Sequence, residues 1–227
     1  MCTIHSALLA SLSPSLNALV NGEMREARER RVEWDIDEQT LSCFFQFAYA
    51  GYYDFSISYL RAQALAQSED GDVMEHECTC KIRRVSDWNG CGNDGYGFCS
   101  CSAPLNKCLC GDLRRILEAL ELECSAHQKL LIFADYHGIW SLVNLVCQNI
   151  LGALEESIEV SSARVVTELL RNSYSLPNLN ILHDCLLPFV FRNRKRFWKF
   201  PGFRELLRDK NRLSVDLIVQ ILDEDSH

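Results

Sequence analysis

The chain has 227 residues, of which 48% are hydrophobic, and its 23 Lys and Arg against 31 Asp and Glu leave a formal net charge of −8. A chain with this apolar content can bury a core and fold as one or two domains. The acidic balance disfavours nucleic acid as the main partner, because phosphate neutralisation needs clustered Lys and Arg. Polar residues interrupt the most apolar stretch, residues 130–154, which disfavours a membrane span.

The N-terminal part predicts two short helices that meet at a corner. Apolar residues recur at helical spacing over residues 8–20, and Pro14 interrupts them. Ser13 directly before this proline is typical of an N-cap, so the second helix is expected to begin there and to end at Gly22. No Lys or Arg precedes Arg25, which disfavours a secretory signal.

Two short strands and a helix are expected next. Apolar and acidic residues alternate over residues 32–36, as in a half-exposed strand. Asp37 fits the N-cap of a helix with an apolar face, and Gly51 would end that helix. Apolar residues alternate again over residues 53–57, which predicts a second strand.

The composition changes over residues 67–111, where Gly, Asp, Asn and Ser are frequent and neither helical nor strand periodicity is visible. Seven of the 12 cysteines lie there: Cys78, Cys80, Cys91, Cys99, Cys101, Cys108 and Cys110. The other cysteines stand among apolar residues and are expected to be buried thiols: Cys2, Cys43, Cys124, Cys147 and Cys185. Since periodic segments resume on both sides, this segment is interpreted as a flexible insertion within a domain.

Helical patterns fill the rest of the chain. One begins at Ile116, Ser125 is expected to cap a helix that ends at Gly138, and Ser141 is expected to open another that runs to Leu154. Three further helices are expected to begin at Ser162, at Pro177-Asn178 and at Ser214. Short strands among many helices predict an α+β fold that is predominantly α-helical, with a helical C-terminal extension over residues 155–227.

Four segments, in this order, resemble BTB/POZ domains. They are HSALLASLSP at residues 5–14, NGEMRE at residues 21–26, residues 32–53 ending in FAYAGYY, and LIFADYHGI at residues 131–139. The residues that carry the resemblance are His5, Leu9, Ser13, Pro14, Glu26, Tyr49, Gly51, Ala134, Tyr136, Gly138 and Leu142. The C-terminal part, residues 165–217, is similar to the helical tails of BTB proteins from filamentous fungi.

The resemblance implies a BTB/POZ-like domain over residues 1–66 and 112–154, interrupted by the insertion. Such a domain acts by presenting surfaces to a like domain, to a helical tail or to a cullin scaffold. The implied function is a non-enzymatic interaction module and a substrate adaptor for a cullin-3-type ubiquitin ligase in the cytoplasm or nucleus. The implied partners are cullin-3 and another BTB domain, and His5 would have a buried packing role.

The sequence also departs from the family. BTB domains begin with a β-hairpin that helps to pair two copies, and only four residues precede His5 here. Ser6 stands where dimeric members often have a basic residue. The insertion falls between the helix that carries Tyr49 and the helix that carries Ala134. It would therefore block or extend the side of the domain that meets the cullin in adaptors of this family.

The insertion contains candidate zinc ligands: His76, Cys78, Cys80, Cys91, Cys99, Cys101, Cys108 and Cys110. Eight ligands would suffice for two tetrahedral sites, but the pairs are C-x-C and not the more specific C-x2-C. The sequence leaves open a flexible insertion with reduced thiols, a zinc-binding segment and a disulfide-linked one. Zinc is the only cofactor that these residues suggest.

Residues 192–199, RNRKRFWK, interleave cations with aromatic residues. Such a run can stack on bases or act as a nuclear-localisation patch, and it can equally be the solvated end of a helix. No glycine-rich phosphate loop, nucleophile elbow or H-E-x-x-H motif is present, and His127 and His183 have no partner that the sequence identifies. The sequence therefore favours a binding protein over an enzyme.

Overall fold

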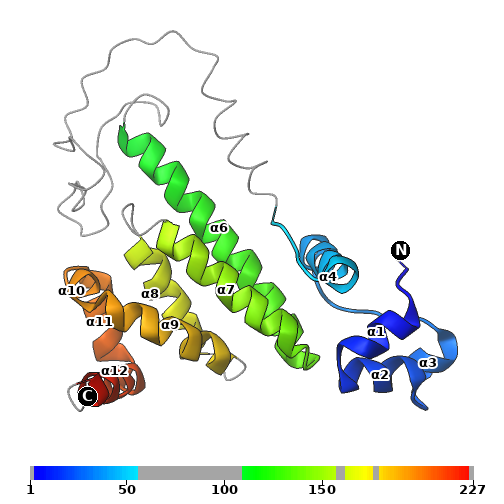
Figure 1. The fold of residues 1–227 in the computed structure, drawn as a ribbon. Coiled ribbons are helices and arrows are strands. Elements are labelled where there is room, and N and C mark those ends of the chain that lie inside the picture. The colour runs from blue at the N-terminus through cyan, green and yellow to red at the C-terminus, as the bar shows by residue number, and fades with distance from the viewer. Residues whose placement is uncertain (1–2, 56–108, 157–161, 176–178, 225–227) are drawn as a thin grey trace, which may run out of the picture. The chain divides into compact units, whose positions relative to one another are not determined.

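The computed structural model describes residues 3–55, 109–156, 162–175 and 179–224 (Figure 1). Within these ranges the chain forms helices and loops and no β-strand. The helices are α1 (Ser6–Leu12), α2 (Pro14–Asn21), α3 (Arg25–Glu29), α4 (Glu38–Ala50), α6 (Leu109–Tyr136), α7 (Trp140–Glu156), α8 (Ser162–Ser173), α9 (Asn180–Arg192), α10 (Arg194–Phe197), α11 (Pro201–Asp209) and α12 (Asn211–Glu224). The prediction of a predominantly α-helical protein is confirmed.

The chain divides into two compact units. Unit 1 consists of Met1–Phe55 and Ser125–Ile150, and unit 2 consists of Ser56–Cys124 and Leu151–His227. Helices α6 and α7 each contribute to both. The predicted domain over residues 1–66 and 112–154 stays a prediction, and most of the predicted insertion lies outside the described residues.

The corner between α1 and α2 forms as the sequence predicts. The Ser13 side chain accepts a hydrogen bond from the Leu16 backbone N–H at 3.1 Å, and Pro14 is the first residue of α2. Proline has no backbone N–H, and this costs no hydrogen bond at the first helical position, because the first N–H groups of a helix have no partner within the helix. The second helix ends before Gly22, as expected.

Residues 32–36 show the predicted alternation of side chains without the predicted strand. Val32, Trp34 and Ile36 are half-buried, whereas Glu33 and Asp35 are exposed. The backbone has no ladder partner within the described ranges, so the segment is a loop that lies along the core. Residues 53–55 are likewise a loop, and residue 57 of the second predicted strand lies outside the described residues. Strand pairing depends on a second segment, which the alternation of one segment cannot supply.

Helix α4 has the predicted residues at both ends. The Asp37 carboxylate accepts hydrogen bonds from the Thr40 backbone N–H and the Thr40 hydroxyl, each at 3.0 Å. Lys129 Nζ lies 3.2 Å from the same carboxylate. At the other end Gly51 adopts φ 76°, a left-handed conformation that favours glycine because other residues carry a Cβ.

Replacing Asp37 with alanine is expected to destabilise unit 1 by about 1 kcal/mol, the usual cost of losing an N-cap. Hydrogen bonds from Thr40 and the nearby Lys129 hold the pKa of the Asp37 carboxyl below its usual value of 3.8. A depressed carboxyl pKa contributes stability that is complete above the unfolded pKa and is lost as the pH falls through the folded pKa.

The measurement is urea unfolding of the wild type, Asp37→Ala and Asp37→Asn at pH 7 and at about pH 3. Asparagine is an equally good cap but carries no charge, so Asp37→Asn should keep most of the stability at pH 7 and lose less of it on acidification. Equal stability of the alanine variant and the wild type at pH 7 would contradict the capping role.

Helix α6 is longer than the sequence predicts. We expected Ser125 to begin a new helix, but α6 continues through this exposed residue, whose neighbours favour helix strongly enough that one serine does not end it. The end of the helix is as predicted. Gly138 adopts φ 64°, its backbone N–H donates to the Asp135 carbonyl at 2.9 Å, and the Ile139 N–H donates to the Ala134 carbonyl at 2.8 Å. This is a Schellman motif closed by the buried Ile139.

The core of unit 1 is an aromatic cluster that joins α4 to the C-terminal half of α6. The rings of Phe44 and Phe133 lie 4.9 Å apart, and Trp34 lies edge-on to both at 5.6 and 5.4 Å. His137 completes the cluster at 4.6 Å from Phe133. Burial lowers the pKa of His137, which therefore packs as a neutral ring at neutral pH.

The core of unit 2 is formed by apolar side chains from several helices that pack together. Its core residues include Val166, Leu170, Leu182, Leu186, Phe189, Val190, Phe197, Phe203, Leu206 and Leu213. These come from α8, α9, α10, α11 and α12, which lie together in Figure 1. The predicted helices after Ser162 and Pro177 are confirmed. The last helix begins at Asn211, before the expected Ser214, whose hydroxyl donates to the Leu207 carbonyl at 2.7 Å.

Among the described residues, no helix is both long enough and apolar enough to cross a lipid bilayer.

Candidate functional site

The residues that resemble the BTB motifs lie in unit 1 and fall into two groups. Leu9, Ser13, Ala134 and Leu142 are buried and pack or cap helices. The second group lies at or near the surface. Pro14, Gly51 and Gly138 stand at helix ends, and Glu26 lies in α3. The remaining three residues carry exposed aromatic rings: His5, Tyr49 and Tyr136. The first group explains how unit 1 holds together, and the exposed aromatic residues are those that a partner can reach.

His5 differs from its expected role. We expected a buried packing residue, but the imidazole is exposed and its Nδ1 lies 3.0 Å from the Tyr49 hydroxyl. The His5 backbone N–H also donates to that hydroxyl, at 3.4 Å. The contact joins the start of α1 to the end of α4, because the Tyr49 side chain reaches across the surface. It thereby connects the first and third motifs.

Ser13 connects the first and fourth motifs. Besides capping α2, its hydroxyl donates a 2.6 Å hydrogen bond to the His137 carbonyl at the end of α6. Both groups are buried, so removing the hydroxyl would leave a carbonyl without its partner. A single serine thus positions the α1–α2 corner next to the turn between α6 and α7.

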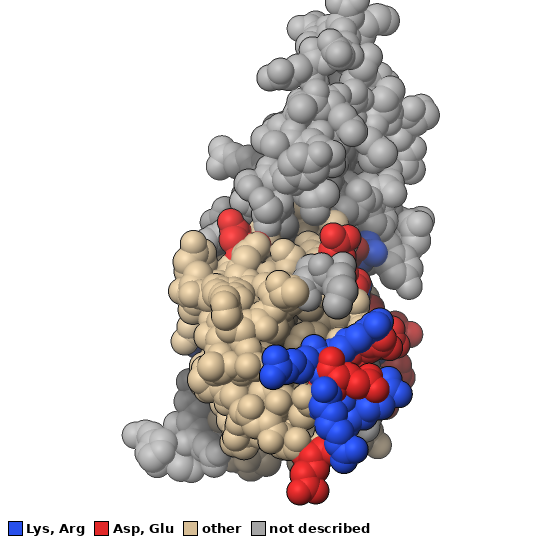
Figure 2. All heavy atoms as spheres, turned by 90° about the vertical axis from the view of Figure 1, so that its right-hand side faces the viewer, with Lys and Arg blue, Asp and Glu red and all other residues tan. Residues whose placement is uncertain are grey.

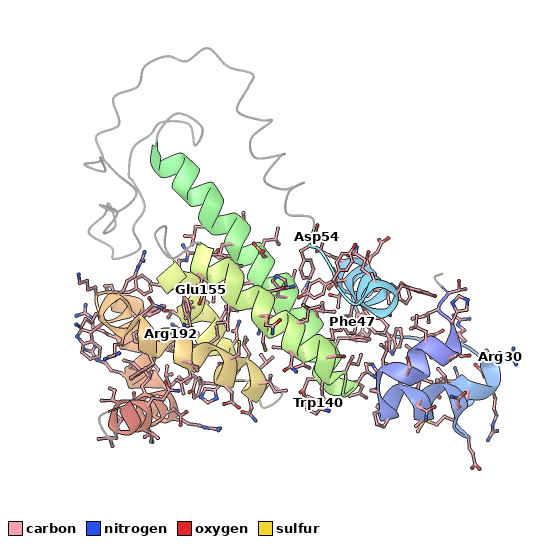
Figure 3. The ribbon with its side chains drawn as sticks, viewed as in Figure 1. Arg30, Phe47, Asp54, Trp140, Glu155 and Arg192 are labelled. Carbon is pink, nitrogen blue, oxygen red and sulfur yellow. The ribbon has the colours of Figure 1, made fainter. Side chains whose placement is uncertain are left out.

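Exposed aromatic side chains gather in the segments that carry the motifs. Tyr136 is 80% exposed at the last turn of α6, and Trp140 is 61% exposed at the first turn of α7, where Figure 3 labels it. Tyr49 is exposed in the last turn of α4, and Tyr52 is exposed just after that helix. Large aromatic residues on a protein surface are typical of binding sites, because they bury much apolar area at low entropic cost.

The charge of unit 1 is unevenly distributed. Residues 3–22 contain no Lys, Arg, Asp or Glu, whereas these types dominate residues 23–33. Figure 2 shows one face on which a wide uncharged area lies beside a group of charged side chains. Within the charged segment, Arg25 pairs with Glu29 at 3.3 Å and Arg31 with Glu33 at 2.6 Å. Depletion of charged residues is typical of the centre of protein–protein interfaces, so the uncharged area is compatible with a protein partner.

Two of the described cysteines, Cys43 and Cys124, behave as core residues. Burial, as the largest cause, raises the pKa of Cys43 to about 11 and that of Cys124 to about 12. Both thiols therefore stay protonated at neutral pH and are poor nucleophiles and metal ligands. Their predicted burial is confirmed, Cys147 and Cys185 are half-buried, and Cys2 lies outside the described residues.

The candidate zinc ligands over residues 76–108 lie outside the described residues, and of Cys110 only the backbone, in α6, is described. Within the part of the chain that the structure does describe, no group of three or more His, Cys, Asp or Glu is placed to hold a metal ion. Zinc binding by the insertion stays a prediction.

The basic run 192–199 is part of the packed structure of unit 2. Arg192 lies 3.5 Å from Glu155 of α7, and the two are labelled in Figure 3. The Arg194 guanidinium lies 4.4 Å from the centre of the Phe191 ring and donates to the Phe191 carbonyl at 3.1 Å. Phe197 is fully buried. These contacts favour the interpretation of the run as a helix end, where cations complement the exposed carbonyls.

Two histidines have partners that the sequence does not reveal. His127 Nδ1 lies 2.9 Å from the hydroxyl of the buried Tyr53. His183 has a carboxylate near each ring nitrogen, with Asp184 at 2.7 Å and Asp216 at 3.2 Å. The Tyr174 hydroxyl donates to the same Asp216 oxygen at 2.8 Å.

The cluster of Tyr174, His183 and Asp216 holds α12 against α8 and α9. Burial, followed by the hydrogen bond to Asp216, raises the pKa of the Tyr174 phenol far above its usual value. The phenol therefore stays a hydrogen-bond donor at all ordinary pH values. Asp216 is 42 residues from Tyr174 in the chain, so only the packing of α12 brings it to Tyr174 and His183.

Comparison with known proteins returned no matching family model, no matching curated protein and no matching solved structure.

Proposed function

We propose that this protein is a non-enzymatic protein–protein interaction module whose binding surface includes Tyr136 and Trp140 of unit 1. The observation that carries the proposal is the exposure of these two aromatic side chains at the turn between α6 and α7, within the fourth motif and directly after it. Trp and Tyr are enriched among the residues that contribute most to binding energy. The turn is held by the Schellman motif and by Ser13, so the aromatic residues stand on a fixed support.

The family we propose is BTB/POZ, with an α+β fold that carries a cysteine-rich insertion. Support comes from the joining of the motifs in one unit: His5 contacts Tyr49, and Ser13 contacts the backbone of His137. By this resemblance the protein acts in the cytoplasm or nucleus as an adaptor that brings a substrate to a cullin-3-type ubiquitin ligase.

The test is calorimetric titration of the full chain with the N-terminal region of cullin-3. We expect saturable 1:1 binding with a Kd of about 1 μM or tighter, and a loss of at least about tenfold in affinity for Trp140→Ala. Trp198→Ala is the matched control, because Trp198 has the same 61% exposure but belongs to unit 2. If both substitutions weaken the affinity for cullin-3 equally, the effect is not specific to Trp140, and Trp140 is not part of the binding surface.

If neither calorimetry nor a second method detects binding, the protein is not a cullin-3 adaptor. The same variants then test the broader proposal with another BTB domain as partner. Binding that depends on Trp140 and not on Trp198 supports the interaction surface in either case. Zinc binding through the insertion and nuclear or nucleic-acid association through residues 192–199 are the alternatives. The contacts of Arg192 with Glu155 and of Arg194 with Phe191 favour a structural interpretation of that run.

A further inference from the structure

Helix α12 has two different faces. Its inner face carries Leu213, which is fully buried. The same face carries the partly exposed Asp216, which accepts the hydrogen bond from Tyr174. Its outer face carries aliphatic residues at the positions i, i+3, i+4 and i+7, which form one stripe along a helix. This outer stripe consists of Val215, Ile218, Val219 and Leu222. Val215 is 57% and Ile218 is 54% exposed, and the other two are similarly exposed.

The charges at the ends of α12 indicate what covers the outer stripe. Arg212 lies in the first turn and Lys210 directly before the helix, whereas Asp223 and Glu224 are its last two residues. A cation at the N-terminus and anions at the C-terminus are each unfavourable for the dipole of the helix that carries them. The same arrangement is complementary to itself when two such helices lie antiparallel, since each basic end then meets an acidic end.

We infer that the outer stripe of α12 binds the outer stripe of a second copy of this chain, with the two helices antiparallel. In this two-fold symmetric arrangement Val215 of one copy lies opposite Leu222 of the other, and Ile218 lies opposite Val219. Arg212 of each copy is then next to the acidic C-terminal end of α12 in the other. The interface is self-complementary, as a two-fold axis requires.

The proposed contact is small. One helix face of four aliphatic residues buries less area than a standard stable interface, so the dimer is expected to be concentration-dependent, with a dissociation constant in the range of about 10–100 μM. The inference does not rest on the proposed function, because it concerns unit 2 and needs no property of the BTB family.

Sedimentation equilibrium of the full chain, with a reducing agent present, tests the pairing over about 1–300 μM protein. The wild type should shift from monomer to dimer, and Ile218→Glu should weaken the dimer by at least about tenfold. Leu122→Glu is the control, because Leu122 lies on α6 and is 50% exposed, close to the 54% of Ile218. A wild type that stays monomeric throughout, or a dimer that Ile218→Glu leaves unchanged, overturns the inference. Circular dichroism confirms that each variant is folded.

Charge reversal tests the antiparallel orientation. Arg212→Glu alone should weaken the dimer, because it places an acidic residue next to the acidic end of the other copy, and the double variant Arg212→Glu/Glu224→Lys should restore it. In a parallel pair, Arg212 of one copy would lie next to Arg212 of the other and far from the acidic C-terminal ends. Arg212→Glu would then create no repulsion with those acidic ends. A dimer that the single variant does not weaken, or that the double variant does not rescue, overturns the antiparallel arrangement.

Discussion

Replacing Phe44 with alanine is expected to lower the free energy of unfolding of unit 1 by about 3–5 kcal/mol. The Phe44 ring is fully buried in α4. It contacts the ring of Trp34, from the loop before α4, and the ring of Phe133, from α6. Its loss removes both the buried apolar area and the edge-to-face contacts, and these partners cannot all move into the cavity. Because a domain has a total stability of about 5–15 kcal/mol, this substitution removes a large share of the stability of unit 1.

Hydrogen exchange measured by mass spectrometry reports on unit 1 separately from unit 2. In Phe44→Ala, peptides from α4 and from the C-terminal half of α6 should lose protection, whereas peptides from α9 and α11 should keep it. Tyr52→Ala is the control, because this aromatic side chain is exposed and should be replaceable within about 0.5 kcal/mol. Unchanged protection of α4 in Phe44→Ala would show that the aromatic cluster does not hold unit 1 together.

The second large effect is expected for Phe197→Ala, with a loss of about 3–5 kcal/mol in unit 2. This residue lies within the basic run but is fully buried, 5.4 Å from the Phe203 ring and 6.1 Å from the Phe189 ring. It anchors α10 between α9 and α11. A run that serves only as a solvated arm for nucleic acid would tolerate the substitution, because nothing would pack on its aromatic residue.

Thermal unfolding and hydrogen exchange of Phe197→Ala and Trp198→Ala decide between the two interpretations. The residues are adjacent and aromatic, but Trp198 is exposed, so only Phe197→Ala should expose α9 and α11 to exchange. If both variants are as stable as the wild type, residues 192–199 have no structural role, and nucleic-acid binding becomes the better interpretation of the run.

Much of the helical architecture follows from local signals. Ser13 with Pro14, Asp37, Gly51 and Gly138 mark helix ends correctly, because capping depends on groups within a few residues of each other. Local signals fail at Ser125, where α6 runs on, and at residues 32–36. In the second case the alternating pattern is real, but a strand also needs a partner that no single segment can specify.

The candidate site depends far more on the tertiary structure. The sequence picks out Tyr136 through its resemblance to a motif, but it gives no reason to select Trp140, whose exposure depends on how the turn is packed. The one signal available was the position of this aromatic residue, two places after Gly138, the glycine that ends α6. His5 shows the opposite error, since a residue expected in the core lies on the surface against Tyr49.

The predominantly helical class, the apolar faces and several helix ends follow from the sequence alone, since each depends on neighbours within one or two helical turns. Tertiary structure alone decided that Ser13 bonds to His137, that Phe197 is buried next to the exposed Trp198, and that Tyr174, His183 and Asp216 meet. It also decided which apolar face of α12 is used within the chain and which is left exposed. The periodicity of a helix identifies apolar positions, but only the packing of other helices determines which of them are covered.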